Sequence, residues 1–228
     1  MGQEITLAQF RRWLLVYADR IAAEEAYLTE LDAAIGDADH GANMHRGMSK
    51  VRDRLADPSL QAGDISALLR IVAMTLISSV GGAAGPLYGA FFLRAAQDSA
   101  QAHAGDAVTL ERLAAMFRSG LEGVQQRGKA QLNDKTMIDA LQPAVEALEA
   151  AAENGATVSE ALQAARAAAE KGARHTIAIQ ANKGRASYLG ARSIGHQDPG
   201  ATSVLFLIEA AATALGQEAP VNQPATRA

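Results

Sequence analysis

Residues 6–41, TLAQFRRWLLVYADRIAAEEAYLTELDAAIGDADHG, combine a long amphipathic segment with an abrupt acidic turn. Thr6 and Gln9 have the spacing of a capping box, in which each side chain hydrogen-bonds a free amide at a helix start. Apolar residues then recur every three or four positions, at Leu7, Phe10, Leu14, Tyr17 and Ile21. This period predicts a helix that runs to about Leu31 and ends at the turn 32–41.

The rest of the chain repeats this organisation of amphipathic segments between turns. Helix periodicity, capping residues and glycine or proline breaks predict further helices over residues 42–55, 65–80, 86–102, 109–128, 136–153, 157–180 and 201–215. No segment has the alternating pattern of a strand, and only 4% of the residues are aromatic, whereas Ala and Leu are abundant. The sequence therefore predicts an all-α protein, an antiparallel up-and-down bundle of seven or eight helices.

Four unusual loops follow every second helix. They cover residues 32–41, 81–86, 128–136 and 182–200, and they are rich in glycine, with three aspartates in the first. Because successive helices in an up-and-down bundle reverse direction, alternate loops lie at the same end. We therefore expect a functional site formed by loops at one end of the bundle.

Composition excludes several classes of protein. The net charge of −4 argues against a nucleic-acid groove, which needs a basic face, and gives no reason to expect binding to an anionic membrane. There is no cysteine for a disulfide or a thiolate metal site. The polar N-terminus lacks the apolar core of a signal peptide, and the longest apolar stretch, residues 71–80, is too short to span a bilayer. A cytoplasmic location is expected.

The first loop places three carboxylates, Asp32, Asp37 and Asp39, within eight residues. Close carboxylates repel one another unless a cation lies between them, and carboxylate oxygens suit Mg²⁺. Mg²⁺ on such a site would face a polyphosphate, as phosphoryl transfer requires. A solvated acidic turn after a helix is the alternative interpretation, and a calcium-binding EF-hand is excluded because the glycine and glutamate positions do not match.

The other loops offer contacts for a nucleotide. Residues 81–85, GGAAG, can present backbone amides to a phosphate or serve simply as an interhelical turn. Arg185 is a candidate for pairing with phosphate, and His40 could donate to a phosphate or make a supporting hydrogen bond. Met137 could line an adenine pocket or belong to the core. Residues 123–130 nearly match a phosphate-binding loop, but Ala130 lacks the hydroxyl that binds the metal.

Four ordered blocks together closely resemble the nucleotide-binding L subunits of dihydroxyacetone kinases. The blocks are IGDADHGANMHRG (35–47), TLISSVGGAAGPLYGAFF (75–92), RGKAQLNDKTMIDAL (127–141) and NKGRASYLGARSIGHQDPGATS (182–203). The resemblance spans the chain to about Leu215 and implies a single domain, residues 1–215, folded as an eight-helix up-and-down barrel. The polar, proline-bearing residues 216–228 are expected to form a disordered tail.

The resemblance also implies the residues of the site. Asp32, Asp37 and Asp39 match the ligands of two Mg²⁺ ions, and no residue is implied as catalytic. The implied nucleotide contacts are His40, Gly41, Ala42, Asn43, Ala83, Ala84, Gly128, Met137, Arg185, Asp198, Pro199 and Gly200. Many relatives have Ser at position 84, so Ala84 removes a hydroxyl that could reach a phosphate.

The implied activity is that of a phosphotransferase with ADP, recycled to ATP, as a tightly held coenzyme. In this family a phosphocarrier subunit of the phosphoenolpyruvate:sugar phosphotransferase system phosphorylates the bound ADP. The resulting ATP passes its γ-phosphate to dihydroxyacetone on a separate K subunit. Two alternatives stay open: the L subunit of an ATP-exchanging kinase for another ketose or a fatty acid, and a regulatory module that docks a transcriptional regulator.

Overall fold

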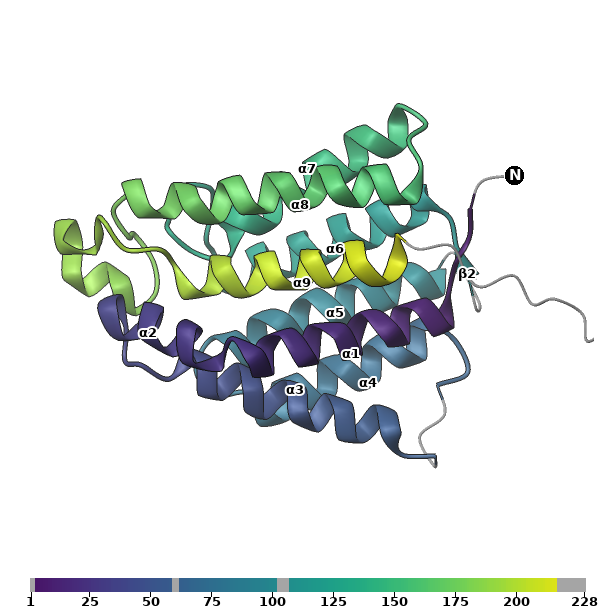
Figure 1. The fold of residues 1–228 in the computed structure, drawn as a ribbon, viewed down its shortest axis with the longest axis horizontal. Coiled ribbons are helices and arrows are strands. Elements are labelled where there is room, and N and C mark those ends of the chain that lie inside the picture. The colour runs from purple at the N-terminus through teal and green to yellow at the C-terminus, as the bar shows by residue number, and fades with distance from the viewer. Residues whose placement is uncertain (1–2, 59–61, 102–106, 217–228) are drawn as a thin grey trace, which may run out of the picture.

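The computed structural model describes residues 3–58, 62–101 and 107–216, and almost all of these belong to helices (Figure 1). In chain order the elements are β1 (Ile5–Thr6), α1 (Leu7–Ala23), α2 (Glu25–Ile35), α3 (His40–Ala56), α4 (Ile65–Ser79), α5 (Ala84–Gln101), β2 (Ala107–Val108), α6 (Leu110–Gly128), α7 (Ile138–Glu153), α8 (Val158–His175), the 3₁₀ helices η1 (Thr176–Ala178) and η2 (Arg185–Ser193), and α9 (Pro199–Leu215). The expected all-α class is confirmed.

Eight of these helices form a closed ring. Each packs against its neighbour in the order α1, α3, α4, α5, α6, α7, α8 and α9, and α9 returns to contact α1. Helix α2 lies outside the ring, at one end, where it contacts α3, α9 and η2 (Figure 1). The described part of the chain is therefore an up-and-down barrel of eight helices with one additional helix at its end, as the family resemblance implies.

Buried aromatic side chains from opposite sides of the ring fill the interior. Trp13 of α1 stacks on Phe117 of α6 with ring centroids 5.6 Å apart, and Phe92 of α5 lies 5.9 Å from the same indole. The indole N–H donates to the carbonyl of Leu207 in α9 at 2.9 Å, so its polar atom is satisfied inside the core. Large side chains that join four helices make the barrel interior a packed core.

Two helix boundaries differ from those predicted. The first predicted helix is divided at Glu24, whose φ of −107° and ψ of 13° are not helical, and its second part continues to Ile35. Asp32 therefore lies in the last turn of α2 and not in a loop. The division lets α2 leave the direction of α1 to pack on α3 and α9, a contact distant in sequence that no local pattern reports.

The segment that follows α8 also differs. The predicted helix over residues 157–180 ends at His175 and gives way to η1, and the loop 182–200 contains the 3₁₀ helix η2. A short antiparallel pair joins Ile5 to Val108 and Thr6 to Ala107, although no strand was expected. Such a pair is too short to have a sequence period of its own.

Each described helix is too short or too polar to cross a membrane. The predicted disordered tail starts at Gly216, and its remaining residues, 217–228, lie outside the described part of the chain.

Candidate functional site

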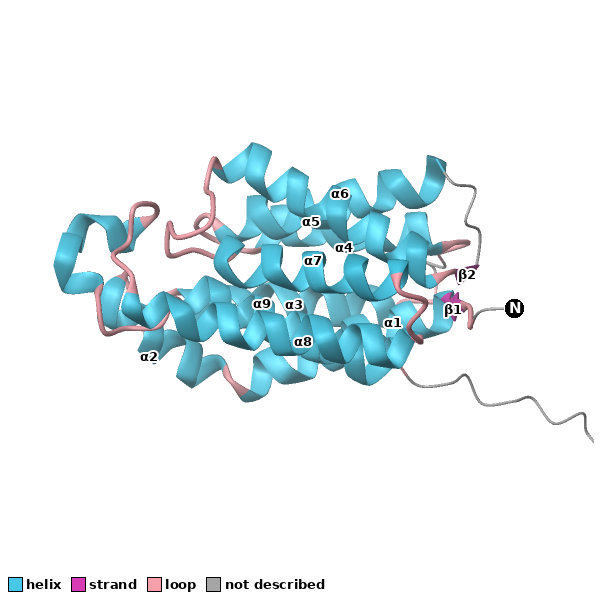
Figure 2. Cartoon of the chain, turned by 90° about the horizontal axis from the view of Figure 1, so that it is seen from above, coloured by secondary structure: helices cyan, strands magenta, loops and turns pink. Residues whose placement is uncertain are grey.

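A cavity opens at the barrel end where α2 and η2 lie. The loops of this end are drawn at the left of Figure 2. All four of the unusual loops contribute to its wall, which confirms that they converge. The lining residues are Asp32, Ile35, Gly36, Asp37, Asp39, His40, Asn43, Gly81, Gly82, Ala83, Ala84, Leu87, Tyr88, Lys135, Thr136, Met137, Lys183, Gly184, Arg185, Ala186, Asp198, Pro199 and Gly200.

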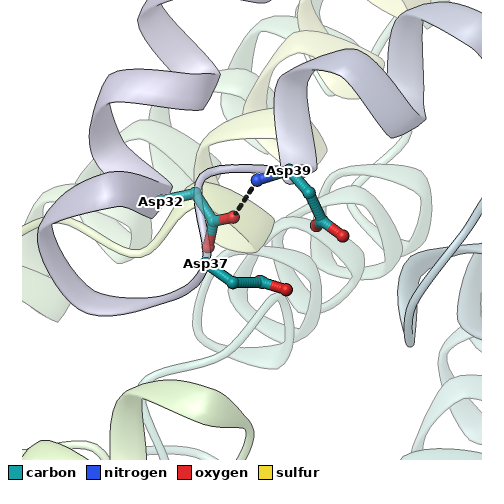
Figure 3. Close-up of side chains that lie close together, drawn as sticks. All are labelled: Asp32, Asp37 and Asp39. Carbon is teal, nitrogen blue, oxygen red and sulfur yellow. Dashed lines mark hydrogen bonds between the residues drawn. The ribbon is translucent and has the colours of Figure 1, made fainter.

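The three aspartates at and after the end of α2 lie close together (Figure 3). All three line this cavity. One ligand oxygen from each of Asp32, Asp37 and Asp39 lies within 4.8 Å of the others. Backbone amides hold the side chain of Asp32 in place, since its Oδ2 accepts hydrogen bonds from the amides of Asp39 at 2.8 Å and His40 at 3.1 Å. Ala38, with a φ of 60°, makes the tight turn between Asp37 and Asp39.

The chemistry of this trio fits a hard divalent cation. All its donor atoms are carboxylate oxygens, and Asp37 and Asp39 are exposed toward the cavity side, whereas Asp32 is buried. Mg²⁺ typically takes one or two carboxylates, retains water and accepts phosphate oxygens in its remaining positions. The site therefore suits Mg²⁺ that also contacts a phosphate.

Four helices begin at the cavity. Its wall contains His40 at the start of α3, Ala84 at the start of α5, Met137 as the N-cap of α7, and Pro199 at the start of α9. The N-terminal ends of helices carry free amides and partial positive charge, so they favour anions. This follows from the topology, because every second helix of an up-and-down barrel starts at the same end. The cavity is thus suited to a polyphosphate.

Arg185 brings a cation to the acidic trio from the opposite wall. It is the first residue of η2, and its Nη2 lies 3.0 Å from Oδ2 of Asp37. The Arg185 side chain keeps 66% of its surface exposed, so it remains accessible to a ligand. Ile35 of α2 and Ala186 of η2 belong to one small buried apolar cluster, which holds η2 against α2. We call residues 176–198, which carry η2, the lid segment.

The ring of His40 points into the barrel. Its Nε2 lies 2.9 Å from Oγ of Ser203, which also accepts a hydrogen bond from the hydroxyl of Tyr88 at 2.8 Å and donates to the carbonyl of Gly200 at 3.0 Å. Burial lowers the pKa of His40, against the opposing effect of Asp32 and Asp39. Burial likewise raises the pKa of Tyr88 to about 12. The ring of His40 thus makes a supporting hydrogen bond to Ser203, and its contact with a phosphate stays a prediction.

Asp198 caps α9 at the base of the cavity. Its Oδ2 accepts the amide of Ala201 at 2.7 Å, and its own amide donates to Oγ1 of Thr176 at 2.9 Å. Burial raises the pKa of Asp198 to about 7; the hydrogen bond from Ala201 and the charge of Lys135 lower it. Asp198 is thus a buried carboxyl that titrates near neutrality.

Three of the residues expected to contact the nucleotide do not line the cavity. Gly41 is buried where α3 crosses α2, and a Cβ on it would lie 2.1 Å from the carbonyl oxygen of Glu25, so a glycine here permits close helix packing. Ala42 is exposed, and Gly128 ends α6 close to Leu87. The other expected residues of the site all border the cavity.

Sequence reasoning missed several lining residues, above all Lys135. This lysine is only 1% exposed, and its φ is 61°. The block 127–141 contained it, but no periodicity or capping rule marks a lysine as buried. Lys183 also borders the cavity.

Comparison with known proteins agrees with this geometry. The DAK2 domain family matches residues 34–213 of the chain. The ADP-binding subunit DhaL of the phosphoenolpyruvate-dependent dihydroxyacetone kinase of Escherichia coli is 52% identical over 210 residues, which cover 92% of this chain and 98% of that protein. The human triokinase/FMN cyclase is 32% identical over 186 residues, which cover 82% of this chain and 31% of that protein.

Among solved structures, the dihydroxyacetone kinase of C. freundii in complex with AMP-PNP and Mg²⁺ is similar, with a TM-score of 0.71 and 29% identity. The alignment covers 93% of this chain and 35% of that one, so the chain spans about a third of the kinase. The match of fold, of nearly the whole sequence and of the family pattern leads to one conclusion. The chain belongs to the DAK2 domain family.

Proposed function

We propose that this chain is the ADP-binding subunit of a cytoplasmic, phosphoenolpyruvate-dependent dihydroxyacetone kinase. It holds ADP as a coenzyme, which a phosphocarrier subunit of the phosphotransferase system phosphorylates. The ATP formed gives its γ-phosphate to dihydroxyacetone bound on a separate K subunit. The E. coli relative with this name aligns with 92% of the chain, which supports the proposal.

One observation carries the proposal: the acidic trio and the starts of four helices border the same cavity. A diphosphate needs both, because Mg²⁺ neutralises part of its charge and free amides at the helix starts donate hydrogen bonds to its other oxygens. We assign Asp32, Asp37 and Asp39 to two Mg²⁺ ions. The catalytic contribution of the chain is then positioning and charge neutralisation, and no side chain has to form a covalent phosphate.

Other lining residues are assigned to the nucleotide. The starts of α3, α5 and α9, with Asn43 and Gly200, are placed to contact ADP, and Arg185 is placed to contact its phosphates. Met137 is 6% exposed and borders the cavity, where its thioether suits the face of an adenine ring. Gly128, Gly41 and Ala42 act indirectly in this assignment, by shaping the walls.

Docking of the partner subunits is proposed at the mouth of the cavity. Residues 171–197 contain no Asp or Glu, and they contain the cations Lys171, Arg174, Lys183, Arg185 and Arg192. Tyr188, on η2, is 87% exposed, and Ile194 is 48% exposed. Exposed aromatic side chains among cations are typical of protein interfaces, and the cations favour partners with acidic surfaces.

The decisive experiment is a reconstitution with the K subunit and the phosphocarrier. Phosphoenolpyruvate should support formation of dihydroxyacetone phosphate with a catalytic amount of ADP, whereas free ATP alone should not sustain turnover. Tyr188→Ala should lower turnover and leave ADP retention unchanged. Turnover with free ATP and rapid nucleotide exchange would instead identify an ATP-consuming kinase. Binding of a transcriptional regulator without turnover would identify a regulatory module.

The alternative of a kinase for another ketose is supported by one specific finding. An L-erythrulose kinase of Pectobacterium atrosepticum is 31% identical over 202 residues, although these cover only 33% of that longer protein. The substrate comparison in the same assay, dihydroxyacetone against erythrulose, separates the two candidates.

A further inference from the structure

We propose that Lys135 is a positioning residue for the nucleotide site, an internal cation that clamps both ends of the lid segment to the loop before α7. Lys135 is a further feature of the cavity wall, distinct from the acidic trio and the helix starts. The role for nucleotide retention rests on the proposed function; the clamp itself does not.

The contacts of the ammonium group carry this inference. Nζ of Lys135 donates to the carbonyl of Thr176 at 2.5 Å, to that of His196 at 2.5 Å and to that of Ile179 at 3.2 Å. A lysine ammonium has three N–H donors and no acceptor, so these three bonds use its full capacity. Lys135 is therefore not a free cation for a phosphate, although it borders the cavity.

The three carbonyls belong to the two ends of the lid segment. Thr176 and Ile179 lie where the chain leaves α8, and His196 lies where it returns toward α9. The two ends also pair directly, since the amide of Gly195 donates to the carbonyl of Ile177 at 2.8 Å. Lys135 thus holds the two ends of the lid segment together. η2, with Arg185 as its first residue, projects from these joined ends.

The loop that presents Lys135 is itself held in place. Asp139, in the first turn of α7, accepts the amides of Asn133 at 2.6 Å and Thr136 at 2.8 Å. The carbonyl of Asp134 accepts the amide of Asn182 at 3.1 Å, which adds a second link to the lid segment. The left-handed backbone conformation of Lys135 costs conformational energy, which these contacts offset.

Charge makes the clamp specific for a cation. Three carbonyl oxygens direct partial negative charge at Nζ, and the carboxylates of Asp198 and Asp139 act on it through space. An apolar side chain at position 135 would leave three carbonyls without their partner in a buried place, a costly arrangement. The effect would fall on the lid segment and on Asp198, which follows His196 by two residues.

The test compares Lys135→Met with Lys129→Met. Lys129 is an ideal control because it lies in the same loop with a φ of 54°, is exposed, and does not border the cavity. Two measurements are made: the rate of Mg-ADP dissociation, and the rate of tryptic cleavage after Lys183, Arg185 and Arg192 without nucleotide. The melting temperature without nucleotide reports the barrel itself.

We expect Lys135→Met to raise both the dissociation rate and cleavage of the lid segment at least about tenfold over Lys129→Met, the loss expected for hydrogen bonds from a charged donor. The melting temperature without nucleotide should change little by comparison, because the barrel itself stays folded. Lys135→Arg keeps a cation with several donors, so it should restore part of the protection of the lid segment from trypsin. Unchanged cleavage of the lid segment in Lys135→Met would overturn the clamp. Unchanged dissociation with faster cleavage would overturn its role in nucleotide retention.

Hydrogen exchange on the unaltered protein gives a second measurement if Lys135→Met does not fold. The amides of Gly195 and Asn182, at the base of the lid segment, should exchange at least about tenfold more slowly than the exposed amides of η2 without nucleotide. Equal exchange rates would contradict the clamp. Failure of the unaltered protein to retain Mg-ADP would refute the proposed function and leave these tests of the clamp intact.

Discussion

Arg185 and Asp37 form an ion pair across the cavity, with Nη2 of the arginine 3.0 Å from Oδ2 of the aspartate. The first residue of η2, within the lid segment, thus contacts the acidic trio directly. Both side chains also suit parts of a Mg-diphosphate, the guanidinium its oxygens and the carboxylate its metal. If Mg-ADP binds here as proposed, its binding and the position of the lid segment are coupled through this pair.

Arg185→Gln should weaken Mg-ADP binding by about 10- to 100-fold, the usual effect of losing a charge-assisted hydrogen bond. The matched control is Arg192→Gln, because Arg192 is also an exposed arginine of η2 but does not border the cavity. Isothermal titration with Mg-ADP measures both. Equal affinity in the two variants would exclude contact between Arg185 and the phosphates.

Gly41→Ala should destabilise the protein by about 1–3 kcal/mol through overpacking between α2 and α3. The added Cβ would lie 2.1 Å from the carbonyl oxygen of Glu25 and 2.3 Å from Oγ1 of Thr29. Gly63→Ala is the control, since nothing lies within 4 Å of a Cβ there. Urea unfolding measures the free energy of each variant, and equal stability of the two would contradict the tight crossing of α2 and α3.

The pH dependence of stability should carry a contribution from Asp198. Its pKa is raised to about 7 in the folded protein, whereas an unfolded aspartate has a pKa near the model-compound value of 3.8. Between these pH values the folded state binds a proton that the unfolded state has lost, so this group lowers the stability as the pH rises. The decrease is largely complete above a pH of about 7.

Asp198→Asn removes this titration and keeps a good N-cap for α9. The difference in unfolding free energy, unaltered protein minus variant, should fall by about 1–4 kcal/mol from pH 4 to pH 8, measured in urea without metal. Asp139, Lys135 and Asp32 act on the carboxyl of Asp198, and all three are kept in both proteins. A difference that is constant with pH would show that Asp198 is ionised throughout.

Much of the barrel was predictable from sequence because its signals are local. The capping box predicted at Thr6 is present. The helices predicted over 65–80, 109–128 and 157–180 begin next to the side-chain caps Asp64, Thr109 and Thr157. The rule that alternate loops lie at the same end then placed the candidate site without any knowledge of the tertiary contacts. This worked because an up-and-down topology turns order along the chain directly into position at one end.

The features that sequence reasoning did not predict depend on contacts between residues distant in sequence. Lys135 bonds a carbonyl 61 residues away, and the hydroxyl of Tyr88 meets Ser203 across 115 residues. The division at Glu24 likewise follows from the packing of α2 and not from a helix-breaking residue. Local propensity reports none of these, since tertiary contacts override it.

The resemblance identified more of the site than residue chemistry did, but it gave no geometry. It grouped Gly41, Ala42 and Gly128 with the nucleotide contacts, and the structure places them behind or beside the cavity wall. The resemblance implied no role for Lys135 and did not predict the hydrogen bond between His40 and Ser203. A sequence match thus names positions, whereas the structure shows which side chains face the cavity.

The most direct measurement is the affinity for ADP with and without Mg²⁺ in the unaltered protein, Asp37→Asn and the control Asp53→Asn, whose aspartate is exposed on α3 away from the cavity. If the acidic trio holds the metal that binds the diphosphate, chelation of Mg²⁺ and Asp37→Asn should each weaken ADP binding more than about 100-fold, or about 3 kcal/mol. Asp53→Asn should bind like the unaltered protein. Equal ADP affinity in Asp37→Asn and the unaltered protein, at saturating Mg²⁺, would contradict the account.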